Sequence, residues 1–112
     1  MEKSIFAKII DRDLPADIVY EDSECLAFRD VRPVAPCHVL LIPKKILVDL
    51  NAAHDDDITL LGTLLRRVPQ IAKQLNYDAY RVVINNGAGA GQTVYHLHIH
   101  IIAGRALQWP PG

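Results

Sequence analysis

The apolar residues of the chain recur at helical spacing in two places. Near the beginning, Ser4 can cap a short helix, and Pro15 marks the end that we expect for it. The apolar stripe of this helix is formed by Ile5, Phe6, Ile9 and Ile10. Steps of three and four residues place these side chains on one face, through which the helix should pack against the rest of the fold.

The second helical repeat predicts the only long helix. Three acidic residues, Asp55–Asp57, come just before it, and negative charge favours a helix N-terminus. Its apolar face is formed by Ile58, Leu61, Leu64, Leu65, Val68, Ile71, Ala72 and Leu75. Pro69 lies inside this pattern and removes one backbone donor, so we expect a kink near Leu65.

Five shorter apolar runs predict strands, at residues 18–20, 25–28, 38–42, 80–85 and 95–103. Asp22, Ser23 and Glu24 separate the first two runs and are typical of a hairpin turn, while Pro43 stops the third. Hairpins come early and helices are segregated from strands. The sequence therefore predicts one α+β domain over residues 1–112, with a largely antiparallel five-stranded sheet, one short helix and one long helix.

Composition narrows the class of protein. The 12 Lys and Arg residues against 13 Asp and Glu residues leave a formal net charge of -1, so we expect no nucleic-acid partner. The longest apolar stretches, such as residues 39–42, are far shorter than the ~20 residues that span a bilayer, and no leader segment is visible. Cys25 and Cys37 form no Cys-x-x-Cys pair. We therefore expect a soluble, cytoplasmic protein that does not bind membranes.

The candidate chemistry lies in the last predicted strand, where His96, His98 and His100 alternate with apolar residues. Alternation on a strand places the three imidazoles on one face, about 6.6 Å apart in succession, and the apolar residues between them on the other. A row of imidazoles is costly on an apolar strand unless it is solvated or used. Three imidazoles at this spacing therefore favour a functional role for the row.

Two other interpretations of the histidine row stay open. The row can be the solvated side of an edge strand. Alternatively, two histidines at i and i+2 can share one zinc ion, with His38 or His54, or Cys25 or Cys37, approaching in space. Against a metal ion, His96 and His100 would be about 13 Å apart on a flat strand.

The loop before the histidines, residues 85–93, contains three glycines and two alanines. Such a segment lets backbone N–H groups approach a phosphate closely. It is neither a Walker A loop nor a dinucleotide fingerprint, because no Gly-Lys-Ser/Thr follows and a strand comes next. A flexible turn is the simpler interpretation of this loop. Its position beside the histidines, however, favours an anion-binding loop. Together they predict phosphoryl or nucleotidyl transfer onto a histidine.

Residues 96–102 resemble the histidine triad motif, His-apolar-His-apolar-His-apolar-apolar. The resemblance extends over nearly the whole chain. The segments that are similar to the Hint branch of that superfamily are residues 5–10, 26–30, 35–38, 42–45, 91–95 and 109–112. It implies a purine nucleoside phosphoramidase, which cleaves the P–N bond of nucleoside 5′-phosphoramidates and aminoacyl-adenylate-like compounds without a cofactor. It also implies a homodimer whose two five-stranded sheets form one ten-stranded sheet.

The resemblance assigns roles to residues of this sequence. His98 would be the nucleophile, His100 would contact the phosphate and leaving group, and His96 and His38 would form the supporting hydrogen-bond network. The residues around the phosphate would be Asn85, Gly91, Gln92 and Thr93. Asp30 would bind the ribose. The base pocket would be lined by Ile5, Phe6, Ile9, Leu14, Phe28, Val31 and Leu40. Residues 104–112, with Trp109, would lie near the active site of the dimer partner.

The chain also departs from that pattern. Thr93 stands where close relatives usually have Ser, and its extra methyl group can alter the fit of the leaving group. Ile46 stands where relatives often have His. The Cys-x-x-Cys pair that some bacterial members place at Ser4 to Ala7 is absent, so we expect no zinc. Two alternatives to the phosphoramidase stay open: a metal-dependent hydrolase with the histidines as ligands, and a non-catalytic nucleotide-sensing scaffold.

Overall fold

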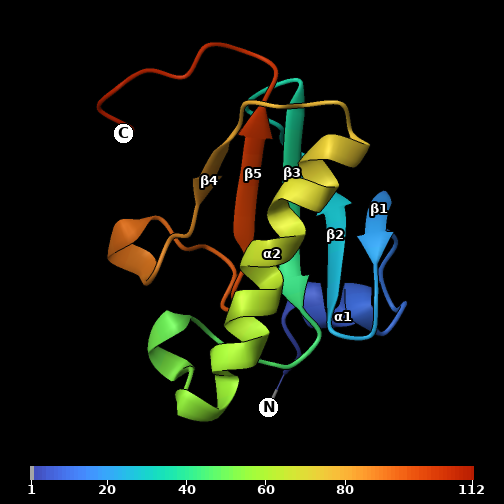
Figure 1. Cartoon of the computed structure of the whole chain (residues 1–112). Helices are drawn as coiled ribbons and strands as arrows, with labels where there is room; N and C mark the ends of the chain where they lie inside the picture. The colour runs from blue at the N-terminus through green and yellow to red at the C-terminus, as the bar shows by residue number, and fades with distance from the viewer. Residues whose placement is uncertain (1) are drawn as a thin grey trace.

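Five antiparallel strands and two helices make up the computed structural model of this chain, which describes residues 2–112. Their order in the sheet is β1-β2-β3-β5-β4, so β1 and β4 form its edges. The strands are β1 (Ile18–Glu21), β2 (Cys25–Arg29), β3 (Cys37–Pro43), β4 (Arg81–Val83) and β5 (Ile99–Ala103), and the helices are α1 (Ile5–Ile10) and α2 (Ile58–Gln74). The predicted α+β class is confirmed (Figure 1).

The two helices cover opposite faces of the sheet (Figure 1). On one face, the apolar residues Val39, Leu41, Ile99 and Ile101 pack with the buried side of α2. On the other face, alternate residues of β2 and β3 pack with α1. The period of two along β3 therefore divides the core into a large cluster under α2 and a smaller one under α1. Phe6 belongs to the smaller cluster.

The first hairpin forms at the predicted turn. Strands β1 and β2 are joined through Asp22–Glu24, and Asp22 Oδ1 accepts hydrogen bonds from the N–H groups of Glu24 and Cys25 at 2.8 and 2.9 Å. An aspartate that bonds the backbone two residues further on stabilises a tight turn. This is the physical reason for the turn signal in the sequence.

One helix end differs from the prediction, and one helix start agrees with it. Helix α1 begins after Ser4, whose Oγ accepts from Ala7 N–H at 3.0 Å, but it ends at Ile10, well before Pro15. The left-handed backbone of Arg12, with φ of 64°, turns the chain away. Asp55–Asp57 form a 3₁₀ turn directly before α2, where the acidic residues were expected, and Asp57 accepts from His54 N–H.

Three of the predicted helix-face residues are exposed. Ile5 on α1 is 50% exposed, and Ile58 and Leu65 on α2 are 66% and 55% exposed. The rest of the α2 face is buried or half-buried, as expected. Pro69 lies inside α2, which continues through it from Ile58 to Gln74. The expected kink at this proline stays a prediction.

The last two strands are shorter than predicted. Strand β4 covers three residues of the expected 80–85, and β5 begins at Ile99, so His96 and His98 precede the strand. The segment before β5 bonds elsewhere: Leu97 N–H donates to Leu47 O at 2.7 Å, outside the ladder. Strand β5 lies between β3 and β4 and is not an edge strand. The interpretation of the histidines as a solvated edge is therefore wrong.

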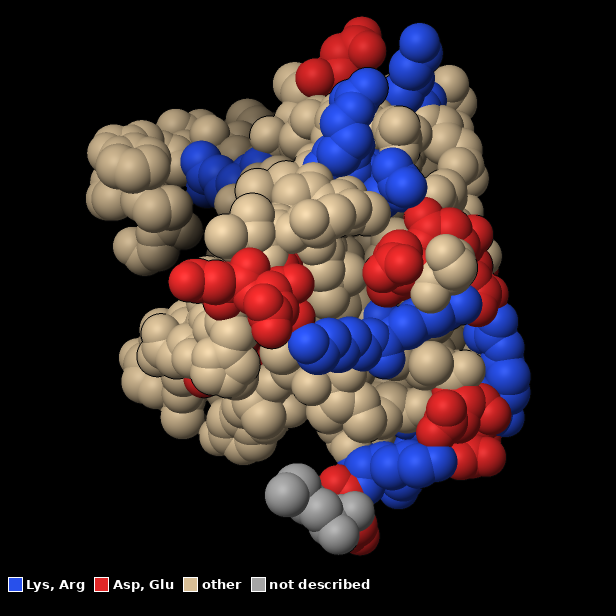
Figure 2. Space-filling model, turned by 60° about the horizontal axis from the view of Figure 1, so that its bottom comes forward, with Lys and Arg blue, Asp and Glu red and all other residues tan. Residues whose placement is uncertain are grey.

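Charged side chains of both signs are interspersed on the face seen in Figure 2. Several of them form ion pairs, including Lys3 with Asp11, Arg12 with Glu21 and Lys44 with Glu21. Within residues 2–112, neither helix is long and apolar enough to cross a bilayer.

Candidate active site

A cavity of about 360 Å³ opens on the α1 face of the sheet, and His98 and His100 lie in its wall. Its volume falls within the range of roughly 300–1,000 Å³ that is usual for small-molecule sites. It contains most of the residues that the resemblance assigned to a nucleoside and its phosphate. They are Ile5, Phe6, Ile9, Phe28, Asp30, Val31, Leu40 and Thr93.

His38 and His100 stand on paired strands and are joined by a hydrogen bond of 2.9 Å between His38 Nε2 and His100 Nδ1. Val34 N–H donates to His38 Nδ1 at 3.2 Å, which makes Nδ1 an acceptor and places the proton of the neutral ring on Nε2. His38 therefore donates to His100 Nδ1. This leaves the proton of His100 on Nε2, a buried atom without a partner in residues 2–112.

The other two histidines are oriented by backbone carbonyls. His98 Nδ1 lies 2.7 Å from His96 O, and His96 Nε2 lies 2.9 Å from Pro43 O. A carbonyl only accepts, so both of these nitrogens carry the proton. His98 therefore keeps the lone pair on Nε2, while His96 Nδ1 accepts from Ser4 Oγ at 3.4 Å. One set of hydrogen bonds thus selects the tautomer of each histidine.

Burial disfavours the charged form of three histidines in this network. Burial lowers the pKa of His100 to about 4, and the neighbouring His98 and His38 act in the same direction. Burial also lowers the pKa of His38, against the attraction of Asp30, and the pKa of His96, against its bond to Pro43. At neutral pH these imidazoles are hydrogen-bonding groups and not cations.

These lowered pKa values predict that stability falls in mild acid. The unfolded chain binds a proton on His100 near the ordinary value of 6.5, whereas the folded chain resists it until pH is about 4. Because the unfolded state then holds more protons, the free energy of unfolding should decrease as pH falls from about 6.5 towards 4. Urea unfolding midpoints at pH 7.5, 6 and 5 measure this directly.

His100→Gln should flatten that pH dependence, while the same change at the exposed His54 should preserve it. Equal midpoints for the parent protein at pH 7.5 and 5 would contradict the prediction.

The glycine-rich loop is held by the buried side chain of Gln92. Its Oε1 accepts from Gly87 N–H at 2.8 Å, and its Nε2 donates to Val48 O at 2.7 Å and Val94 O at 3.1 Å. Gly87 and Gly91 have φ of 94° and 97°, which favours glycine. The amide of Gln92 is therefore occupied with the loop itself, and Thr93 is the loop residue that reaches the cavity wall beside the histidines.

Some predicted site residues lie elsewhere. Leu14 lines a different hollow, beside Arg12 and Pro15. His38 and His96 are buried behind the cavity wall, and Asn85, Gly91 and Gln92 do not line the cavity. Trp109 is 84% exposed on the C-terminal tail, which runs away from the sheet beyond β5 (Figure 1).

Sequence reasoning missed three groups that orient the histidines: the N–H of Val34, the carbonyl of Pro43 and the hydroxyl of Ser4. The two backbone groups carry no signal in the sequence. Ser4 did carry one, since it was predicted to cap the first helix. The same hydroxyl also donates to His96 Nδ1, because a hydroxyl can accept one hydrogen bond, here from Ala7 N–H, and donate another.

Part of this network is also a candidate metal-binding group. Asp30, His38 and His100 form the one group in the described chain whose possible ligand atoms lie within 4.8 Å of one another. The set does not fit a metal ion as arranged, because the His38 nitrogen that faces the group carries the proton. Cys25 and Cys37 lie in the core under α2, and His54 belongs to the turn before α2. None of them completes the set.

A model of the HIT domain matches residues 11–107. A HIT-like protein from Synechocystis is 59% identical over 112 residues, which are 99% of this chain and 98% of that protein. The 14 kDa zinc-binding protein of Zea mays is 48% identical over 97% of this chain and 88% of its own length.

Solved structures agree in fold. A HIT family hydrolase from Legionella pneumophila matches with a TM-score of 0.95 and 45% identity, covering 98% of this chain and 100% of that one. The histidine triad nucleotide-binding protein of Candida albicans matches with a TM-score of 0.80 and 32% identity, over 98% and 85% of the two chains.

Proposed function

Because this chain belongs to the HIT domain family, we propose that it is a nucleotide-binding hydrolase that cleaves the P–N bond of purine nucleoside 5′-phosphoramidates. Aminoacyl-adenylate-like compounds would be substrates of the same site, and a nucleoside monophosphate would be the product. The names of the Legionella and Candida proteins, a hydrolase and a nucleotide-binding protein, support both halves of this proposal.

The tautomers of His98 and His100 are the observation that carries it. His98 presents a lone pair on Nε2, because its Nδ1 proton is directed to His96 O. His100 holds a buried, unpartnered Nε2–H, the only such side-chain atom in residues 2–112, and both residues lie in one cavity wall. A nucleophile beside a donor with no partner of its own is the arrangement that attack on a phosphoryl group requires.

The proposed reaction has two steps. His98 Nε2 attacks phosphorus, the P–N bond breaks, and the amine nitrogen keeps the electron pair and takes a proton from solvent. Water then attacks phosphorus, the bond to His98 breaks, the nucleoside monophosphate leaves, and a proton returns to solvent. His100 Nε2–H donates to a phosphate oxygen in both steps, while the neutral His38 holds His100 in its tautomer.

The nucleoside would lie in the apolar part of the same cavity. Phe6 and Phe28 meet edge to face with ring centroids 5.3 Å apart, and Phe6 also meets the His98 ring at 5.0 Å. Asp30 lines the cavity while its Oδ1 accepts from Arg32 N–H, so the carboxylate is held in place by the turn. We assign the ribose hydroxyls to Asp30 and the phosphate to Thr93, with Asn85, Gly91 and Gln92 shaping its loop.

The homodimer belongs to the same proposal. Strand β4 is an edge of the sheet, and Val82 on it is 39% exposed. An edge strand with an exposed apolar residue is a surface that a second strand can pair with. Pairing there would continue the sheet into a ten-stranded one. The tail at residues 104–112, which Arg81 contacts through Gln108 O at 2.7 Å, would then reach the partner's active site.

A metal-dependent hydrolase is the second candidate on the name of the maize zinc-binding protein alone, since Asp30, His38 and His100 do not fit an ion as arranged. A non-catalytic scaffold is less well supported, because it has no need of the lone pair that His98 presents. One experiment addresses all three. The protein is incubated with a panel of nucleoside phosphoramidates, with and without a strong chelator, and trapped in acid for peptide mass spectrometry.

We expect monophosphate release that the chelator does not change, and a nucleotidyl group on the peptide that carries His98. Activity lost with the chelator and restored by zinc would favour the metal enzyme. Nucleotide binding without release of any amine would favour the scaffold.

A further inference from the structure

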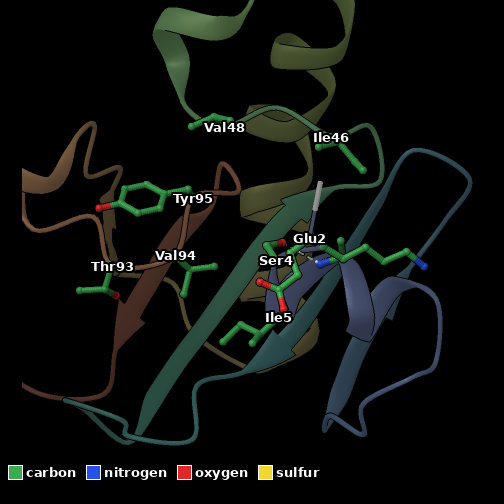
Figure 3. Close-up of a pocket in the computed structure, with 10 residues that line it drawn as sticks. Glu2, Ser4, Ile5, Ile46, Val48, Thr93, Val94 and Tyr95 are labelled. Carbon is green, nitrogen blue, oxygen red and sulfur yellow. Dashed lines mark hydrogen bonds between the residues drawn. The ribbon is translucent and has the colours of Figure 1, made fainter.

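Two loops, one at each end of β3, hold the residues of the candidate site. The loop after β3 carries Val48 past the segment before β5 (Figure 3), and Val48 O accepts from Gln92 Nε2 at 2.7 Å. The loop before β3, residues 30–36, carries Val34, whose N–H donates to His38 Nδ1 at 3.2 Å. Whatever holds this second loop therefore also holds the tautomer of His38.

The loop at residues 30–36 has little support of its own. Its two prolines have no N–H group to donate, and Val31 and Val34 are 93% and 53% exposed. Within residues 2–112, two side chains from outside the loop bond to its backbone: His38, which accepts from Val34 N–H, and Arg105. An exposed loop with so few contacts depends on each of them for its position.

Arg105 holds Val34 from the side opposite to His38. Its Nε donates to Val34 O at 2.8 Å, and its Nη1 donates to Ala106 O at 3.1 Å, so two carbonyls orient the guanidinium. Strand pairing brings Arg105 to this place. Cys37 pairs with Ala103 at the end of the β3–β5 ladder, and the contact with the loop lies just beyond that pair.

Gly104 brings the chain after β5 into close contact with the same loop. A Cβ atom at this position would lie 2.9 Å from Pro36 Cβ, closer than such atoms normally approach, and the φ of 95° also favours glycine. The backbone at Gly104 therefore packs directly on the loop, next to the hydrogen bond of Arg105. Packing and hydrogen bonding fix the loop together.

The orientation of Val34 controls two protons. With its N–H directed at His38 Nδ1, His38 carries its proton on Nε2, and His100 carries its own on the buried Nε2. Without that donor, the opposite tautomers would satisfy the bond between the two rings equally well, with His100 Nδ1–H donating to His38 Nε2. His100 Nε2 would then hold a lone pair instead of the N–H that the proposed reaction uses.

We propose that Arg105 is a positioning residue: by holding Val34, it selects the tautomers of His38 and His100 in which His100 Nε2 carries the proton. Arg105 does not line the nucleotide cavity, so its effect passes through the loop and not through contact with the substrate. The consequence for hydrolysis rests on the proposed function, because the phosphate contact of His100 is assigned there. The tautomers themselves can be measured without any substrate.

The test compares the parent with Arg105→Ala, Arg105→Lys and Arg81→Ala. Arg81 is the matched control, because it also bonds to a carbonyl near the C-terminus, Gln108 O at 2.7 Å, but not to the loop. The ¹⁵N chemical shifts of the imidazoles at pH 7.5 report which ring nitrogens carry protons. We expect His100 Nε2 to be protonated in the parent and to lose part of its proton occupancy in Arg105→Ala. Arg105→Lys, which can still donate to Val34 O, and Arg81→Ala should resemble the parent.

Kinetics on a nucleoside phosphoramidate separates this inference from the proposed function. We expect Arg105→Ala to lower kcat about five- to tenfold and to leave KM unchanged, since it removes one hydrogen bond that orients the donor. If none of the proteins hydrolyses the compound, the proposed reaction fails, while the ¹⁵N shifts still decide the role of Arg105. Unchanged shifts or an unchanged kcat in Arg105→Ala, or an equal change in Arg81→Ala, would overturn that role.

Discussion

His98→Ala should lower the rate of phosphoramidate hydrolysis by ~10³-fold or more and preserve binding of the nucleoside monophosphate. The substitution removes the Nε2 lone pair that is proposed to attack phosphorus. It leaves the other hydrogen bonds of the network, between His38 and His100 and between His96 and Pro43, in place. The loss should therefore fall on the chemical step, while the apolar contacts around Phe6 and Phe28 still hold the base.

Single-turnover rates and equilibrium binding of adenosine monophosphate distinguish the two effects. His54→Ala is the control, because this histidine is exposed and lies in the turn before α2. Hydrolysis by His98→Ala within a few-fold of the parent would remove His98 from the role of nucleophile. A parallel loss of monophosphate binding would mean that the imidazole serves mainly to shape the cavity.

Leu97→Ala should lower the free energy of unfolding by about 2–5 kcal/mol, which is a large part of the stability of a domain of this size. Leu97 is 2% exposed and belongs to the large cluster under α2, so truncation leaves a cavity inside a packed core. It is also the residue between His96 and His98. Its side chain anchors, from the α2 side, the segment that presents both histidines on the other side.

Leu65→Ala is the matched control, since it is the same substitution at a leucine that is 55% exposed. It should cost less than about 0.5 kcal/mol, because alanine is a good helix former and little buried surface is lost. Urea denaturation of the two variants gives the comparison. Equal losses would show that Leu97 is not the anchor that its burial indicates.

Most of the fold followed from periodicity. Alternation along residues 97–101 assigned side chains to the two faces correctly, and the helical steps from Leu61 to Leu75 identified the buried side of α2. Element ends were less predictable. Helix α1 stops at Ile10 through a left-handed Arg12, and strand β5 starts late because Leu97 bonds to Leu47. The end of α1 depends on a backbone conformation that has no local signature in the sequence. The start of β5 depends on a hydrogen-bond partner that is remote in the sequence.

The sequence predicted which histidines form the candidate site, but it did not predict their burial or their hydrogen-bond partners. The alternation of His96, His98 and His100 indicated a shared face, and His98 and His100 do meet, with ring centroids 5.1 Å apart. The burial of His96 and the bond from Val34 to His38 were not predictable, since both arise from tertiary packing. The tautomers, and with them the proposed chemistry, are set by these contacts.

The buried amide of Gln92 has a consequence for the thermodynamics of ligand binding. It ties the backbone of the glycine-rich loop at Gly87 and Val94 to Val48 in the folded chain. A glycine-rich segment that a ligand must order costs roughly 1–2 kcal/mol of conformational entropy per residue at the moment of binding. Here that entropy is lost during folding instead. If a phosphate binds beside this loop as proposed, it should therefore meet a loop that is already ordered, and its association should not require a slow conformational closure.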